Sequence, residues 1–101
     1  MDATKRELHV YTADATVNEY YHNVFNCSSG ALTATMPEAK YSQFKDYYIE
    51  RIGAEGNDLT IARTGSTDTF TTGSLTSLTL SGVDEKVHLV ADVENNRWLV
   101  F

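Results

Sequence analysis

The histidine, cysteine, serine and acidic side chains are the residues of this chain that could do chemistry. None of the three histidines, His9, His22 and His88, has a further His, Cys or Glu at the spacing of a zinc or iron site. Glu19 and Glu85 each stand three positions before a histidine, and we interpret them as ordinary polar neighbours. We therefore expect no metal site and no cofactor.

The sequence does not indicate a nucleophilic or phosphate-binding site either. The serines lack the glycine pattern of a nucleophile elbow, and Gly53 and Gly56 lack the Lys-Ser/Thr ending of a phosphate loop. Cys27 lies in a predicted strand with no positive charge close by in the sequence, so we expect a buried, unreactive thiol. Asp84 and Glu85 adjoin in a predicted turn, where solvated carboxylates are the expectation.

Without an acid, base and nucleophile at useful spacing, we expect that the chain is not an enzyme. A small hydrolase or sugar-modifying enzyme is the alternative from another class. Loss of an activity on joint substitution of Asp92 and His88 would support it.

Tyrosines are the candidate contact residues. Tyr20-Tyr21 and Tyr47-Tyr48 place their rings on opposite faces of a strand or on adjacent helical faces, so one ring of each pair is expected in the core. Phe70 is the one large apolar residue of the threonine-rich segment 64–74, which is either an exposed loop or a strand that Phe70 anchors to a shared surface. The candidate partner contacts are therefore Tyr20, Tyr21, Tyr47, Tyr48 and Phe70.

Length and charge restrict the class of protein. The chain has 101 residues, 14 acidic and 8 basic, and a net charge of −6, which suits one acidic domain. Surplus carboxylates repel a phosphate backbone and no basic cluster offsets them, so we expect no nucleic-acid partner. No apolar run has the length of a signal peptide or a membrane span, and the single cysteine needs no oxidising compartment, so we expect synthesis in a cytoplasm and no membrane contact.

Alternating residues predict the β-strands that position these side chains. Leu32, Ala34 and Met36 alternate with threonines, which is the period of a half-buried strand, and Pro37 ends it. Further strands are expected at 22–27, 47–52, 59–63, 75–80, 86–91 and 97–101. Gly, Asn, Asp and Ser between them indicate hairpins that join 22–27 to 31–36 and 47–52 to 59–63.

These strands predict an all-β fold, a small antiparallel β-sandwich or barrel-like domain over residues 17–101, with one or two short helical turns. One turn is expected at 17–21, where Thr16 and Glu19 have capping-box spacing, although a longer helix through Phe25 is an alternative. The other is expected within 38–45. The predicted core comprises Phe25, Leu32, Met36, Ile61, Leu89 and Trp98.

The order of these segments resembles that of the small β-modules of tailed-bacteriophage virion proteins, which occur in tail fibres, tailspikes and head-decorating proteins. The matching stretches are 29–37, 48–52, 57–61, 65–73, 87–92 and 96–101. The chain departs from the pattern at Met36, at Asp46 and in the longer last turn. These departures affect turns and not the alternation of core-facing residues.

The resemblance implies a non-enzymatic structural protein of the virion that assembles as a homotrimer. We expect a capsid decoration or cement protein that binds the major capsid protein or another virion protein. Residues 1–16 are the candidate docking arm or exchanged strand, with Leu8, Val10 and Tyr11 as its contacts. The alternative is a tail-fibre, tailspike or head-fibre module whose exposed tyrosines and threonine-rich loop bind a host surface glycan.

Overall fold

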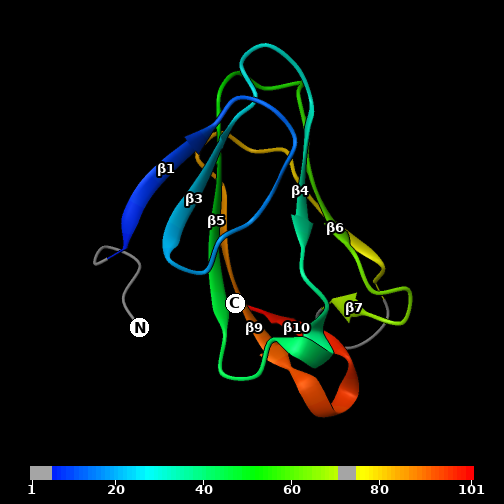
Figure 1. Cartoon of the computed structure of the whole chain (residues 1–101). Coiled ribbons are helices and arrows are strands. Elements are labelled where there is room, and N and C mark those ends of the chain that lie inside the picture. Colours follow the sequence, from blue (N-terminus) through cyan, green and yellow to red (C-terminus); the bar gives the residue numbers. More distant parts are fainter. Residues whose placement is uncertain (1–5, 71–74) are drawn as a thin grey trace.

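Two β-sheets and two short 3-10 helices make up the computed structural model, which describes residues 6–70 and 75–101 (Figure 1). The six-stranded sheet contains, in spatial order, β1 (Glu7–Tyr11), β3 (Tyr21–Asn26), β5 (Asp46–Ile52), β9 (Lys86–Asp92), β10 (Arg97–Val100) and β7 (Thr69–Phe70). The four-stranded sheet contains β2 (Ala15–Thr16), β4 (Leu32–Met36), β6 (Leu59–Arg63) and β8 (Ser77–Leu80). The helices are η2 (Ala39–Tyr41) and η3 (Val93–Asn95).

The first six strands alternate between the two sheets and pair in parallel. In the six-stranded sheet, His22 of β3 lies beside Leu8 of β1 and Tyr48 of β5. In the other sheet, Ala34 of β4 lies beside Ala15 of β2 and Ile61 of β6. The chain therefore stacks three coils, each of which gives one strand to each sheet. Strands β8, β9 and β10 then add antiparallel, and β7 pairs in parallel with β10.

The mostly β content is confirmed, but the sheets have mixed orientation and both predicted hairpins are wrong. β3 and β4 lie in different sheets, as do β5 and β6, so neither pair forms a ladder. The segments between them cross from one sheet to the other. Such crossings use the same Gly, Asn and Asp residues as hairpin turns, and composition therefore does not distinguish the two.

The two crossing segments stack on each other at one end of the molecule, where Figure 1 shows their loops together. The backbone N–H of Cys27 donates to the carbonyl of Ile52 at 2.9 Å, and Asn57 Nδ2 donates to the carbonyl of Cys27 at 2.8 Å. Gly53 has a φ of +108°, and a Cβ there would lie 2.7 Å from the backbone nitrogen of Ser28. This position requires glycine both for its backbone conformation and for the close approach.

The helical turn expected within 38–45 is confirmed as η2, whereas the one expected at 17–21 is wrong. There, Asn18 Oδ1 accepts a 2.8 Å hydrogen bond from the N–H of Tyr20, and the Asn18 carbonyl accepts one from Tyr21 at 3.3 Å. This side-chain turn competes with a helix, as asparagine often does. η3 was not predicted; the residue that follows it, Asn96, has a left-handed φ of +50°.

The hydrophobic core lies between the sheets. Its buried members are Val17, Phe25, Cys27, Ala34, Met36, Ala39, Tyr47, Ile49, Leu59, Ile61, Phe70, Leu80, Leu89 and Trp98. Of the six residues predicted for the core, Leu32 is half-buried and packs against this cluster, and the other five belong to it.

Arg51 of β5 is fully buried and closes one end of the core. Its guanidinium donates to the backbone carbonyls of Asn57 at 2.9 Å, of Gly53 and Gly82 at 3.1 Å each, and of Ala54. Carbonyl oxygens thus solvate the buried cation, and one side chain fastens the 53–57 crossing to the 81–85 turn.

Candidate functional site

A row of rings crosses the outer face of the six-stranded sheet. Strand register places His22, Tyr48 and His88 side by side, and two backbone hydrogen bonds of 3.1 and 2.9 Å join His88 to Phe101. The rings of Tyr48 and His88 stack with centroids 4.1 Å apart and planes 4° apart. Because side chains alternate along a strand, this row points away from core residues such as Ile49.

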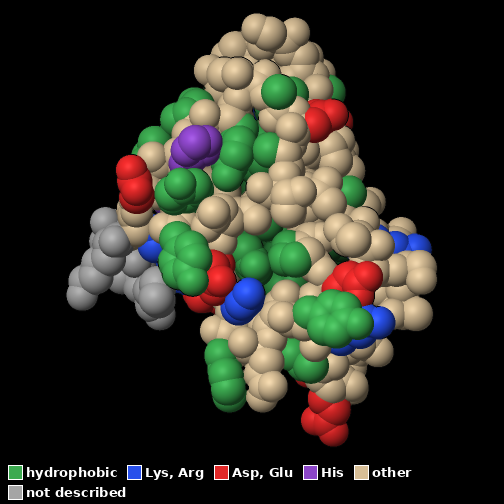
Figure 2. All heavy atoms as spheres, in the orientation of Figure 1, with side chains coloured by type: hydrophobic (Ala, Val, Ile, Leu, Met, Phe, Trp, Pro, Cys, Tyr) green, Lys and Arg blue, Asp and Glu red, His purple; other side chains and the backbone are tan. Residues whose placement is uncertain are grey.

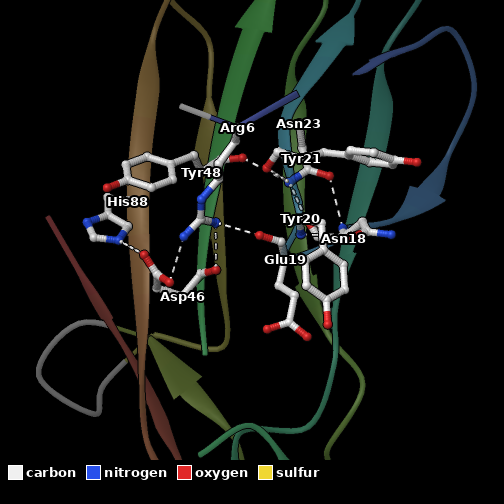
Figure 3. A network of polar contacts seen from close by, with 9 residues as sticks. All are labelled: Arg6, Asn18, Glu19, Tyr20, Tyr21, Asn23, Asp46, Tyr48 and His88. Carbon is white, nitrogen blue, oxygen red and sulfur yellow. Dashed lines mark hydrogen bonds and ion pairs between the residues drawn. The ribbon is translucent and has the colours of Figure 1, made fainter. Parts of the chain in front are cut away.

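A polar network holds one end of this row (Figure 3). Asp46 Oδ1 accepts a 2.7 Å hydrogen bond from Arg6 Nη2, and Asp46 Oδ2 lies 2.7 Å from His88 Nε2. Arg6 Nη1 also donates to the carbonyls of Glu19 and Asp46, at 2.7 and 3.0 Å. The Arg6 guanidinium carbon lies 4.6 Å from the centroid of the Tyr48 ring, so Tyr48 packs against both the arginine and His88.

The network fixes the charge of Asp46. Partial burial alone raises the pKa of this carboxyl group, but the hydrogen bonds from His88 and Arg6 outweigh it and hold the pKa below its ordinary value. Tyr47, on the other face of β5, is kept neutral, because burial and the charge of Glu19 raise its pKa to about 12. Asp46 is therefore a fixed anion that positions Arg6 and His88.

The carboxylate beside His88 differs from the one considered in the sequence. Asp92 Oδ2 accepts hydrogen bonds from Arg97 Nε at 2.7 Å and from Asn95 Nδ2 at 3.0 Å. The carboxylate in contact with His88 is that of Asp46. A carboxylate-bound histidine supplies two of the three members of a nucleophilic triad. Within the described part of the chain, no hydroxyl or thiol group is hydrogen-bonded to His88.

A pocket of about 270 Å³ opens beside the ring row. It is lined by His22, Tyr48, Ile49, Lys86, Val87, His88 and Phe101. The ring of His22 is held by Glu50, whose Oε1 lies 3.0 Å from His22 Nε2. The pocket therefore combines a mainly apolar and aromatic surface with a few polar atoms at fixed positions, as ligand sites commonly do.

The edge strand β1 is a second candidate surface. It pairs with β3 on one side, and its other side has no partner strand among residues 6–70 and 75–101. Leu8 and Val10 point outward and are 59% and 44% exposed. On the opposite face the ring of His9 stacks on Tyr21 at 4.9 Å. Figure 2 shows hydrophobic side chains and a histidine gathered over β1 and β3.

Asn23 joins β1 to the body of the sheet. This buried amide accepts hydrogen bonds from the Tyr11 hydroxyl at 3.0 Å and the Asn18 N–H at 2.9 Å. Its Nδ2 donates to the carbonyls of Asn18, Tyr21 and Tyr48. All the hydrogen-bonding capacity of the side chain is used, so Asn23 sets the position of β1 and of the preceding turn.

Sequence reasoning missed Arg6, Asn23, Asp46 and Arg51. For Asn23 and Arg51 a signal exists, since each is a polar residue in phase with core-facing positions of its strand, two residues from Phe25 and Ile49 respectively. For Arg6 and Asp46 no local signal exists, because their roles depend on contacts between distant segments.

The predicted contact residues divide between the core and the surface. Tyr20 is 74% exposed, and Tyr21 and Tyr48 are half-buried. Tyr47 and Phe70 are core residues, 4% and 0% exposed, so they are not available to a partner in this fold. Phe70 lies beside Trp98 in the β7–β10 ladder and anchors β7.

The predicted docking arm and threonine-rich segment are described only in part. Within the predicted docking arm, Leu8 and Val10 are exposed and Tyr11 is half-buried, and β1 and β2 both pair within their own chain. Residues 1–5 of that arm and 71–74 of the threonine-rich segment lie outside the described residues.

Neither a metal centre nor a membrane span is found in the described ranges. No three His, Cys, Asp or Glu side chains of residues 6–70 and 75–101 are placed to hold a metal ion. In the same residues, no helix combines the length and apolarity needed to cross a bilayer. No protein-family model, curated protein or solved structure matches the chain.

Proposed function

We propose that this chain is a structural protein of a tailed-bacteriophage virion, a capsid decoration or cement protein that docks through the open edge of β1. The resemblance of its segment order supplies the biological setting. The docking element rests on one observation: β1 is an outwardly apolar edge strand with no second partner strand among residues 6–70 and 75–101.

An open edge of this kind is unusual in a protein that stays alone. Its unpaired N–H and C=O groups are a template for another strand, and proteins commonly protect such edges with lysines, prolines or bulges. β1 has the sequence Glu-Leu-His-Val-Tyr, which contains no lysine, proline or bulge, and its one charged residue, Glu7, stands at its first position. Its two outward side chains, Leu8 and Val10, are instead large and exposed.

The occupant we propose is an extended strand of the major capsid protein. Main-chain hydrogen bonds to β1 would supply affinity, and the side chains on the two faces of β1 would supply specificity. Leu8 and Val10 would meet apolar side chains on one face, and His9 would meet polar or aromatic ones on the other. The docked copies form a homotrimer, and the protein is made in the host cytoplasm before it joins the virion.

The test is binding of purified protein to capsids that lack it. The double variant Leu8→Lys and Val10→Lys places two charges on the docking edge, and we expect its affinity to fall at least about tenfold, since charges on an edge strand oppose strand addition. The matched control is Leu75→Lys with Val83→Lys, two exposed aliphatic residues away from β1. It should bind as the unmodified chain does, and circular dichroism should show both variants folded.

Unchanged capsid binding by the β1 variant would contradict docking through this strand. Binding to host surface glycans, with no binding to capsids, would move the assignment to the tail-fibre, tailspike or head-fibre alternative.

A further inference from the structure

The pocket on the outer face has a wall of rings and a floor of backbone. His22, Tyr48, His88 and Phe101 supply the rings. Ile49 and Val87 also line it, and they are neighbours in the β5–β9 ladder. Their side chains belong to the inner face, so they present mainly main-chain atoms to the pocket.

The ring wall is held in place before any ligand arrives. Glu50 fixes the imidazole of His22 at 3.0 Å, and Asp46 fixes that of His88 at 2.7 Å. Tyr48 is stacked on His88 at 4.1 Å. A site whose walls are already ordered loses little conformational entropy when it binds, which favours affinity for a small ligand.

Lys86 supplies a cation at this pocket. It is exposed, and its ammonium group has no hydrogen bond or ion pair to any residue within 6–70 and 75–101. Glu50 stands opposite Lys86 in the ladder, but the carboxylate of Glu50 lies against His22, with Oε1 3.0 Å from Nε2. The ammonium group is therefore available to an anion.

We propose that this pocket binds a six-membered ring that carries one carboxylate. A volume of about 270 Å³ lies just below the range of pockets for drug-sized ligands, so it admits one ring-sized group. The aromatic and apolar walls contact the ring, and Lys86 pairs with the carboxylate. Glu50 and Asp46 on the same face repel a second negative charge, which favours a monoanion.

Aromatic acids and sugar acids share this chemistry. The inference does not rest on the proposed docking through β1, because neither Leu8 nor Val10 lines the pocket. Capsid binding by a pocket variant therefore tests the docking proposal separately.

The experiment is a titration of the ¹⁵N-labelled full chain at pH 7, followed by backbone amide shifts. Benzoate and glucuronate are the two acid probes, and benzamide and glucose are their neutral counterparts. We expect saturable shifts at Val87, His88 and Phe101, and about tenfold tighter binding of the acid than of its neutral counterpart, because a charge-assisted hydrogen bond is lost in the neutral pair.

Two lysine variants test the role assigned to the cation. Lys86→Gln should abolish the preference for the acid while leaving capsid binding unchanged. Lys40→Gln is the control, since Lys40 is an exposed lysine on η2, outside the pocket, and pairs with Glu38 at 3.6 Å. Phe101→Ala, at a side chain 73% exposed, should weaken binding of the acid without unfolding the domain.

Saturable binding of benzoate alone would support an aromatic acid, and saturable binding of glucuronate alone would support a sugar acid. Absence of saturable shifts with both acids would overturn the proposal. So would binding of the acids by the Lys86→Gln variant as tightly as by the unmodified chain.

Discussion

Trp98 is the largest fully buried side chain of the domain. Its indole packs edge-on against the ring of Tyr47, with centroids 5.5 Å apart and planes at 78°, in the cluster that also contains Ile61 and Leu89. Its Nε1 atom has no hydrogen-bond partner among the described residues, so its contribution there is packing.

Trp98→Ala should therefore lower the free energy of unfolding by on the order of 3–5 kcal/mol, which can be most of the stability of a domain of this size. Urea denaturation followed by circular dichroism measures the loss. Val83→Ala, at an exposed residue, should leave the midpoint nearly unchanged. A Trp98→Ala variant as stable as the unmodified chain would show that the packing around the indole is not a main source of stability.

Asp46 makes stability depend on pH, and the direction follows from its lowered pKa. A carboxyl group whose pKa is lower in the folded than in the unfolded chain stabilises the fold above the unfolded value. That contribution is lost as pH falls through the folded pKa, hence below the ordinary value of 3.8. Burial opposes the shift, and the hydrogen bonds from His88 and Arg6 cause it.

We expect Asp46→Asn to remove this part of the acid sensitivity. Urea midpoints at pH 7 and pH 3 should differ less for the variant than for the unmodified chain. Asp84→Asn, in an exposed turn, is the matched control and should keep the full difference. An equal loss between the two pH values in all three proteins would mean that the Arg6–Asp46–His88 network does not stabilise the fold.

At the scale of elements, the stacking of the two crossing segments is the feature that most distinguishes this fold from a hairpin protein. Gly53 and Gly56 both have positive φ, +108° and +98°. They differ in their surroundings, because a Cβ at Gly53 would lie 2.7 Å from Ser28 N, whereas a Cβ at Gly56 would have no atom within 4 Å. Substitution of Gly56 therefore measures backbone strain alone, whereas substitution of Gly53 measures backbone strain together with the cost of separating the two segments.

Gly56→Ala should cost about 1–2 kcal/mol, which is the price of a left-handed conformation for a residue with a Cβ. Gly53→Ala should cost a further 1–3 kcal/mol or so, because it also separates two packed backbones. Chemical denaturation of both variants gives the comparison. Equal losses would contradict the close stacking of the crossings.

At the scale of the whole molecule, the proposed assembly predicts a native mass. The chain has a mass of 11.2 kDa, and a homotrimer should sediment at about three times this value. Sedimentation velocity or light scattering over a dilution series measures it. A monomer that persists at high concentration and also fails to bind capsids would contradict the assembly proposal.

Local sequence patterns predict seven of the strands, β3 to β6 and β8 to β10, and much of the core. Alternation of Leu32, Ala34 and Met36 is a local pattern, and β4 occupies this stretch. β9, β10 and the helical turn η2 follow for the same reason. Phe25 and Trp98 are buried because large apolar side chains in phase with a strand face its packed side.

The pairing of the strands and the contacts between distant polar groups depend on tertiary packing. Hairpin turns and crossings between sheets have the same composition, so the sequence does not distinguish an antiparallel ladder from stacked parallel coils. The coils also differ in length. Glu7 of β1 pairs with Tyr21 of β3, 14 positions later, whereas His22 of β3 pairs with Tyr48 of β5, 26 positions later, so the sequence contains no fixed repeat. Arg6, Asp46 and His88 come together only because β5 and β9 are neighbours in the sheet and Arg6 precedes β1. Such long-range contacts depend on strand order, which is set by packing of the two sheets rather than by any local pattern.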